Sequence, residues 1–497
     1  MLLTETDLIN MKITADAEMN NSDMIRDLIN EDSSSELKRS MADGERYYVG
    51  EHDIYKKDFC KTYISETSTI DGSEVESRKI FRNPNRSNHH NVNAFHSILV
   101  DQKAAYLVGR EPTISVRGAE SDPQLKIYEN MITCAADEKL NGILSDLVIG
   151  ASNKGVEYIH FYYDQEFKLR YCIVPATEII PIYDTEHQAE LIEVIRYYDI
   201  TVVQGKEKVL RKKVEWWTKN DVTFYTEDES GRYLPDNSQH MNPMPHWFDI
   251  SSFDGKETIT KAHSWGRVPF VVLENNARRI SDLQKVKGLI DAYDLISSQG
   301  TNDLLDLVTL YWSIQGYGGE TADAIAKKLQ INRAVNISDS SGSIDAKQVN
   351  LPVSGRIDWL KMLRRDIFEF GMGVNTESEK LGNASGVSLK FQYTQLDLKA
   401  NTMAPRIKAA IKDFFWFITE DYNRNNGTNF DSCLLNITIN RTMITNDLET
   451  VQMIDLSKGI VSEKTLLSKH PFVEDVNEEI KEIEVNKESY PKEVVGK

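Results

Sequence analysis

The chain has 497 residues and a formal net charge of −19, with 40% hydrophobic and 27% charged residues. This composition is typical of a soluble globular protein, and the length predicts several domains. No apolar run approaches the roughly 20 residues of a membrane-spanning helix. The first 40 residues lack the basic start and apolar block of a secretion signal, so we expect the chain to stay in the cytoplasm where it is made.

The acidic charge is concentrated at both ends of the chain. Residues 1–40 hold nine acids and four bases, and residues 474–497 hold eight and four, which leaves −10 for the middle. Tight nucleic-acid binding needs clustered Lys and Arg, so any contact with DNA is predicted to be weak. The four cysteines are scattered without a CxxC pair, which indicates buried free thiols rather than a zinc site or disulfides.

The first half of the chain predicts an α+β fold with a mostly antiparallel sheet. Residues 1–39 are predicted to be an acidic, weakly ordered lead-in with a helix near Asp23–Asn30. Helical periodicity follows at 91–108 and about 123–152. The Pro-rich stretch 234–260 is predicted to be a loop before a short strand at 268–273. Alternating β-branched and aromatic residues predict strands at 156–163, 167–174, 190–198, 208–217 and 221–226.

The second half is predicted to be mainly helical. Helices at 281–307 and 353–372 form a hairpin around a small α/β insert at 308–352, which contains a GYGG turn. A polar loop at 373–386 leads into a very long amphipathic helix from Gly386 to Tyr422, and we expect a kink just before Pro405. A strand at 434–441 and a charged helical region from Asn446 complete the chain.

Few residues suggest chemistry. The chain has no GxxxxGK[ST] loop, HExxH, GxSxG, EF-hand or GxGxxG motif, so no cofactor is predicted. Asp291 and Asp294 stand three apart on a helix and could share a metal, although two carboxylates make a poor site and helix packing is the simpler interpretation. Lys361, Arg364 and Arg365 lie on one side of the 353–372 helix and could face DNA or a subunit interface.

Several phrases of the sequence together resemble a known family. They resemble the portal (connector) proteins of long-tailed bacteriophages, in the branch that infects Gram-positive hosts. The resemblance covers about residues 40–480. Its phrases are VDQKAAYLVGREP at 100–112, SNKGVEYIHFYYD at 152–164, WGRVPFVVLENN at 265–276, SDLQKVKGLIDAYDLISS at 281–298, SGVSLKFQYTQLDLKAN at 385–401, FFWFI at 414–418 and HPFVEDVNEEI at 470–480.

The resemblance implies a non-enzymatic ring of about twelve subunits at one capsid vertex, through which double-stranded DNA is packaged and ejected. It implies a β-rich wing at 40–280, stem helices at 281–307 and 353–372, and a clip at 308–352. A tunnel loop would occupy 373–386, a long kinked helix and a wing strand 387–445, and a helical crown with a charged tail 446–497. The implied partners are the terminase large subunit, the major capsid and scaffolding proteins and the head–tail adaptor, without a membrane.

The resemblance also implies roles for single residues. Glu377, Glu379 and Lys380 make the loop more charged than a uniformly small polar set. The protein would be found in the virion, at the capsid vertex, and in the host cytoplasm during assembly. The loop residues implied to face DNA are Asn375, Thr376, Glu377, Lys380, Asn383 and Ser385, and the clip residues implied to meet the motor or adaptor are Tyr317, Gly318, Lys327 and Lys328.

Two alternatives remain open from the sequence. A metal-dependent nuclease or phosphotransferase would use Asp291 and Asp294 with other acids. A capsid or tail scaffold protein would form sheets or tubes without a DNA channel. Closed rings with an axial pore wide enough for a duplex would distinguish the portal from the scaffold protein. Mg²⁺-dependent DNA cleavage that is lost on Asp291→Asn with the ring intact would support the enzyme.

Overall fold

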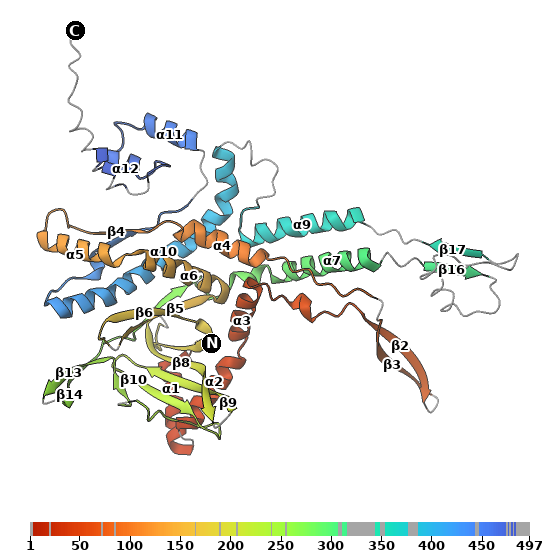
Figure 1. Cartoon of the computed structure of the whole chain (residues 1–497), viewed down its shortest axis with the longest axis horizontal. Helices are drawn as coiled ribbons and strands as arrows, with labels where there is room; N and C mark the ends of the chain where they lie inside the picture. Colours follow the sequence, from red (N-terminus) through yellow and green to blue (C-terminus); the bar gives the residue numbers. More distant parts are fainter. Residues whose placement is uncertain are drawn as a thin grey trace, which may run out of the picture. The chain divides into compact units, whose positions relative to one another are not determined.

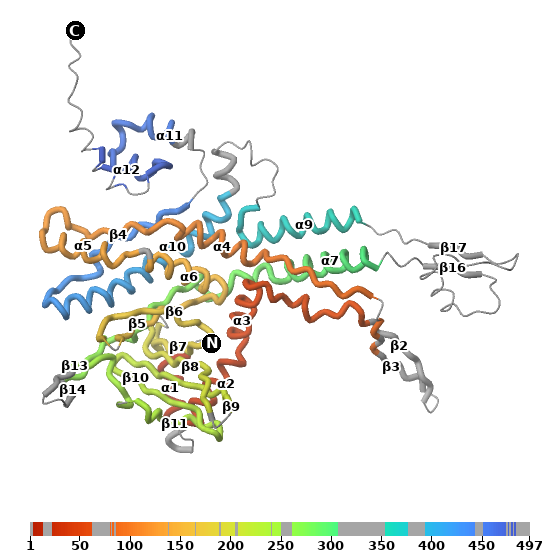
Figure 2. Tube along the Cα trace, in the orientation of Figure 1, coloured from red at the N-terminus to blue at the C-terminus, as the bar shows by residue number. Residues whose placement is uncertain are grey.

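The computed structural model divides into two compact units, residues 1–100 with 147–371, and residues 101–146 with 372–497 (Figures 1 and 2). The structure describes residues 3–18, 21–70, 73–83, 86–164, 166–187, 190–204, 207–239, 241–253, 256–306, 311–315, 343–347, 353–375, 386–442, 447–473, 476, 479–480 and 482–483.

The first unit is built on a largely antiparallel sheet, as predicted. Its strands follow the order β1-β7-β8-β9-β10-β11, with β12 also paired to β10 and only β1 added in parallel. The predicted strands at 190–198, 208–217 and 221–226 are present, and β7 was missed. The strands are β1 (Leu3–Thr4), β7 (Ile179–Tyr183), β8 (Leu191–Gln204), β9 (Glu207–Trp217), β10 (Asp221–Glu227), β11 (Tyr233–Pro235) and β12 (Met244–Pro245).

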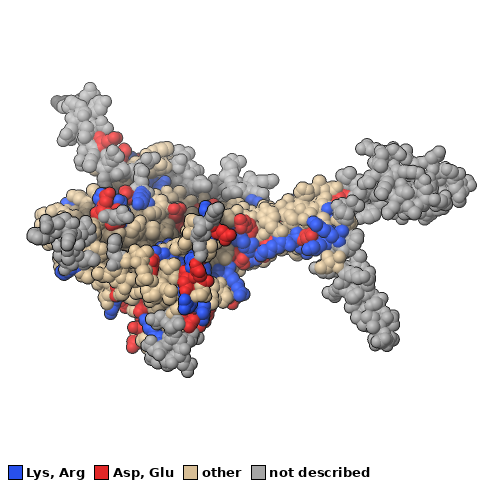
Figure 3. Space-filling model, turned by 60° about the horizontal axis from the view of Figure 1, so that its bottom comes forward, with Lys and Arg blue, Asp and Glu red and all other residues tan. Residues whose placement is uncertain are grey.

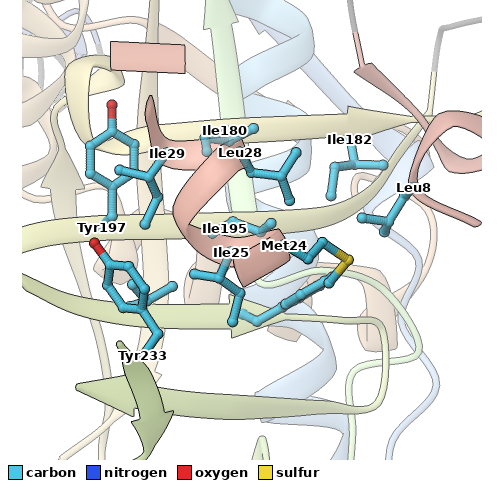
Figure 4. Close-up of a cluster of buried hydrophobic side chains, with 12 residues drawn as sticks. Leu8, Met24, Ile25, Leu28, Ile29, Ile180, Ile182, Ile195, Tyr197 and Tyr233 are labelled. Carbon is cyan, nitrogen blue, oxygen red and sulfur yellow. The ribbon is translucent and has the colours of Figure 1, made fainter. Parts of the chain in front are cut away.

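The N-terminal helices α1 (Glu5–Glu18) and α2 (Asn21–Ser34) belong to the core of this unit (Figure 4). Four apolar residues of α2, Met24, Ile25, Leu28 and Ile29, are buried against the sheet. Their spacing places them on one face of the helix, where burial supplies the stability that a charged helix lacks alone. The prediction of a weakly ordered lead-in is therefore wrong, although its helix near Asp23–Asn30 is present.

A buried lysine fixes the next helix, α3 (Glu36–Tyr48), to the sheet. Lys38 donates hydrogen bonds to the carbonyls of Ala176 (2.6 Å) and Ile179 (2.7 Å), and it pairs with Asp32 at 3.2 Å. Burial lowers the pKa of Lys38, and the neighbouring Asp32 carboxylate opposes that shift. The ammonium thus joins α3 to the backbone where β7 begins.

A second, smaller sheet has the order β15-β5-β6, with β5 at Val156–Tyr163, β6 at Leu169–Val174 and β15 at Phe270–Glu274. Its core holds the fully buried His160, whose ring lies 4.5 Å from the rings of Phe270 and Trp217, centroid to centroid. His160 Nδ1 donates to the carbonyl of Pro269 at 3.1 Å. Burial lowers the pKa of His160 to about 3 and that of the neighbouring His246 to about 4.

These two histidines predict acid sensitivity of the first unit. Their pKa values are lowered from 6.5, so the unfolded chain binds protons that the folded chain does not, and stability falls as the pH falls below about 6.5. Between pH 7 and 5 each histidine is expected to cost about 2 kcal/mol. Urea unfolding at both pH values should show a smaller loss for His160→Gln than for the wild type. The exposed His187 supplies the control: His187→Gln should leave the loss unchanged.

Two further hairpins extend from the first unit. One pairs β2 (Lys61–Ile70) with β3 (Ser73–Arg82), and the other pairs β13 (Trp247–Phe253) with β14 (Lys256–His263). The second overturns the prediction of a loop at 234–260. Prolines on its N-terminal side suggested a loop, yet the Asp254-Gly255 pair between two apolar-polar alternating runs is a hairpin signal in the sequence.

The second unit is organised around the long helix α10 (Gly386–Asn426), which continues through Pro405 as one helix. The predicted kink at Pro405 stays a prediction. Phe414, Phe415 and Phe417 are buried, and Tyr128 of α5 bonds Thr419 at 2.9 Å. The other elements of this unit are β4 (Thr113–Val116), α5 (Pro123–Ala135), β18 (Leu435–Thr438), α11 (Asp447–Leu456) and α12 (Glu463–Leu467). The helices α4 (Phe95–Val108) and α6 (Glu138–Lys154) belong to it at residues 101–108 and 138–146 and to the first unit at their other residues.

Three other predictions meet the structure here. The helical region predicted at 123–152 is two helices, α5 and α6, and the strand predicted at 434–441 pairs with β4 as β18. All four cysteines are free, but Cys134 and Cys433 are exposed, so the prediction of buried thiols is wrong for these two. Within the described part of the chain, no helix combines the length and the hydropathy that a membrane span needs.

Candidate functional site: the α7–α9 hairpin and its strap

Two long helices of the first unit lie side by side and extend away from its sheet (Figure 1). They are α7 (Lys287–Asp306), preceded by the short turn η3 (Asp282–Lys285), and α9 (Val353–Gly371). Both predicted helices, at 281–307 and 353–372, are therefore present. At the base Ile290 packs with Ile367 and Phe368, and toward the tip Arg356 pairs with Asp303 at 2.7 Å. Contacts at both ends hold the helices antiparallel.

Beyond the tip, the insert is described only at two strands. β16 (Tyr311–Gln315) and β17 (Ser343–Lys347) pair antiparallel. Both strands lie within the α/β insert predicted at 308–352. The other predicted elements of the insert lie outside the described residues.

A segment from far earlier in the chain, residues 86–93, runs along α7, and we name it the strap (Figure 2). Four side chains of α7, spaced four residues apart, accept hydrogen bonds from every second backbone amide of the strap. The pairs are Asp306 with the amide of Ser87 (2.9 Å), Asn302 with His89 (2.7 Å), Ser298 with Asn91 (2.9 Å) and Asp294 with Asn93 (2.9 Å). The helix thus takes the place of a neighbouring strand for a segment that joins no sheet.

The strap ends at the most buried carboxylate of this ladder. Asp294 has no exposed surface, and it accepts hydrogen bonds from His52 Nδ1 at 2.5 Å and from Asn93 Nδ2 at 2.8 Å. Asp291, one turn away, accepts instead from the Tyr47 hydroxyl and from Lys287 Nζ (3.2 Å). The two carboxylates therefore serve different partners. Among the described residues no group of three His, Cys, Asp or Glu is arranged to hold a metal ion.

A charged network at the base of α7 surrounds Tyr47. Lys287 Nζ lies 2.5 Å from Asp53, which Arg46 also contacts at 2.9 Å. Burial acts to raise the pKa of Asp53, but the ammonium of Lys287 and the other cations outweigh it and hold that pKa well below its usual range. Burial and the Asp291 carboxylate raise the pKa of Tyr47. The network ties α3 to α7.

The structure separates the three basic residues predicted to act together on α9. Arg364 places its guanidinium over the rings of Phe95 (5.6 Å) and Phe368 (5.4 Å), and Arg365 pairs with Asp366 at 2.8 Å. Lys361 is exposed and forms no ion pair with a described residue. Lys and Arg side chains do gather along one face of the arm that the hairpin forms (Figure 3).

Only the start of the predicted loop at 373–386 is described. The Gln102 side chain holds it there, because Gln102 Oε1 accepts from the amide of Val374 and Gln102 Nε2 donates to its carbonyl, both at 2.9 Å. Asn375 follows directly. Thr376, Glu377, Lys380, Asn383 and Ser385 lie outside the described residues, as do Tyr317, Gly318, Lys327 and Lys328 of the insert.

Comparison with known proteins decides the family. The family model described as "Phage portal protein, SPP1 Gp6-like" matches residues 28–493. The chain belongs to this portal family. The portal protein of Bacillus phage SPP1 is 33% identical over 476 residues, which cover 94% of this chain and 86% of that protein. The portal protein of Clostridium phage phiCD119 is 29% identical over 476 residues, covering 91% and 93%.

Membership in the portal family resolves the alternatives left by the sequence. Portal proteins are structural and non-enzymatic, so the nuclease or phosphotransferase alternative is wrong, and Asp291 and Asp294 are packing residues. The alternative of a scaffold without a channel is likewise set aside. The mixed helix and sheet content of this portal protein agrees with the predicted α+β class. The family implies an oligomeric ring that associates with the capsid and DNA.

The strap is the part of this portal protein that the sequence did not predict. Residues 86–93 read RSNHHNVN and show neither a helical nor a strand period. In α7, Asp294, Ser298, Asn302 and Asp306 form a polar stripe at every fourth position. A polar stripe on a helix that also has an apolar side usually faces solvent, so this spacing alone does not identify the strap.

Proposed function

We propose that this portal protein forms a closed ring of about twelve subunits at one capsid vertex, the channel through which double-stranded DNA is packaged and later ejected. The terminase large subunit would dock first and the head–tail adaptor later, beside the major capsid and scaffolding proteins. The observation that carries this proposal is the family match over residues 28–493. During assembly the subunits would reside in the host cytoplasm.

The proposal assigns each region a part in the ring. Residues 40–280 would be the wing, α7 and α9 the stem, and 308–352 the clip. Residues 373–386 would form the tunnel loop, 387–445 the long helix and wing strand, and 446–497 the crown. The strap supports the stem assignment, because four backbone amides bound along α7 stiffen an arm that would otherwise rest on one helix pair.

The acidic charge suits a channel in which DNA must move. Residues 41–473 carry −10 of the net −19 charge, so their acidic side chains outnumber the Lys and Arg that could bind DNA phosphates. DNA affinity rises steeply with each phosphate that Lys or Arg neutralises, and tight contacts would resist sliding. Lys361, Arg364 and Arg365 would then serve the ring and its channel by packing and by weak contacts.

Native mass measurement with electron microscopy of the purified chain tests the proposed ring. We expect closed rings of about twelve copies of the 56.8 kDa chain, with an axial pore wide enough for a duplex. A sample that stays monomeric or dimeric at every concentration would overturn the proposal.

Deletion of Glu377–Asn383 is expected to leave ring assembly intact and to abolish DNA packaging, because the tunnel loop would lose its contact with DNA. The measurement is DNA protected from nuclease in a defined packaging assay. A control variant replaces the same residues with Gly and Ser at equal length. If it packages normally, the length of the loop matters rather than its charges, and unaltered packaging by the deletion itself would refute the tunnel-loop assignment.

A further inference from the structure

Helix α9 exposes large apolar side chains on two opposite sides. Ile357 is 47% exposed, Trp359 51% and Phe370 55%. Successive helical residues are rotated by about 100°, so Ile357 and Trp359, two positions apart, point in nearly opposite directions. Trp359 and Phe370, eleven positions apart, fall on the same side. Neither side is the buried one, which carries Leu363 and Ile367.

The side of Ile357 continues onto α7. The ring of Phe95 contacts both Tyr293 of α7 (4.9 Å) and Phe368 of α9 (6.0 Å), so these three mark one side of the hairpin at its base. Leu304 lies eleven positions after Tyr293, and Ile357 lies eleven positions before Phe368. Both therefore lie on the side of Phe95 nearer the tip. Leu304 is 61% exposed.

The hairpin thus has two unlike apolar flanks. The Trp359 flank consists of Trp359, Asp366 and Phe370. The Ile357 flank consists of Ile357, Leu304 and Lys361. Each flank combines exposed apolar side chains with one ionisable group. The first carries the Asp366 carboxylate, which pairs with Arg365 at 2.8 Å, and the second carries Lys361, which forms no ion pair with a described residue.

We propose that the Trp359 flank of one copy packs against the Ile357 flank of the next copy around the ring. This rests on the proposed ring function and names the contact that closes it. A cyclic assembly of identical chains joins two different surfaces of each subunit, and the two flanks meet that requirement with exposed apolar side chains on both, a carboxylate on one and an ammonium on the other. Exposed tryptophan is the side chain that most often dominates the binding energy of an interface.

Charge substitutions separate this arrangement from its alternatives. Trp359→Glu and Ile357→Lys should each raise the concentration at which half the rings dissociate by roughly tenfold or more, measured by mass after dilution. The double variant places a Glu opposite a Lys at every contact, so it should recover most of the loss. Asp358→Lys, on the outward side of the same helix, is the matched control and should change little.

Three outcomes would overturn the proposal. If the rings of the single variants dissociate at the same concentration as wild-type rings, the flanks are not buried in the ring. A double variant weaker than both singles would show that like flanks meet. A wild type that forms no rings would refute the proposed function together with this contact, whereas the first two outcomes leave the ring intact.

A cross-linking measurement avoids any dependence on weakened variants. A benzophenone amino acid at position 359 is placed in rings mixed from isotopically light and heavy copies, and its adducts are mapped by mass spectrometry. We expect adducts between copies at peptides that contain Leu304 or Ile357. Adducts confined to peptides near position 359 of another copy would contradict the proposed pairing.

Discussion

Replacing Asp294 with alanine is expected to lower the free energy of unfolding of the first unit by about 3–5 kcal/mol, because three hydrogen bonds to one buried carboxylate are lost together. Asp294 has no exposed surface and accepts hydrogen bonds from His52 Nδ1 and from both the amide and side chain of Asn93. Alanine would leave these donors buried without an acceptor.

Hydrogen exchange read by mass spectrometry locates the effect. In the Asp294→Ala variant the strap amides should exchange much faster, because the strap loses its most buried hydrogen bonds, while amides of the second unit keep their protection. Asp291→Ala is the control. Its carboxylate is partly exposed and accepts hydrogen bonds from Tyr47 and Lys287 instead, so the free energy of unfolding is expected to fall by about 1 kcal/mol. Equal losses for the two variants would contradict the ladder as the source of stability.

Gly44→Ala is expected to destabilise the first unit by at least about 3 kcal/mol, and so to prevent assembly under ordinary conditions. A Cβ at this position of α3 would lie 1.9 Å from the backbone oxygen of Asn153 in α6 and 3.2 Å from Ser281 Oγ. Asn153 is buried and its side chain bonds His96 at 3.1 Å, so α6 cannot easily move away. The helices would have to separate.

The control lies on the same neighbouring helix. Gly142 of α6 has nothing within 4 Å of its added Cβ, so Gly142→Ala should stabilise the chain by up to about 1 kcal/mol through helix propensity alone. Thermal unfolding of both variants gives the comparison. A Gly44→Ala chain as stable as the wild type would mean that α3 and α6 do not approach so closely.

Elements with a strong local period could be predicted from the sequence. The strand at 156–163 matches β5 residue for residue, and the helices around Leu289 and Leu363 begin and end within a few residues of their predicted bounds. In these segments the apolar residues recur with the period of the helix or strand, and the side that they form is the buried side. The portal family was predicted from phrases spread over most of the chain, and the comparisons confirm it.

Features that depend on distant partners could not be predicted. The strap amide of Asn91 finds its acceptor 207 residues further along the chain, and nothing in RSNHHNVN announces it. The N-terminal helices also depend on a distant partner. Their charges suggested weak order, but the structure shows Ile25 and Leu28 buried against the sheet. On α9, Lys361, Arg364 and Arg365 follow one another closely, yet only the packing shows that Arg364 covers two aromatic rings.

The ladder between the strap and α7 has a built-in limit of length. Four residues of an α-helix advance about 6.0 Å, whereas two residues of extended chain advance about 6.6 Å. The mismatch of about 0.6 Å per step grows to about 2 Å over four rungs, near the tolerance of a hydrogen bond. Four rungs are therefore close to the most that two straight repeats can share. One residue inserted in 86–93, with the strap still bound at its Asn93 end, would turn every earlier amide away from the helix. The β2–β3 hairpin, which precedes the strap, would be re-aimed with them.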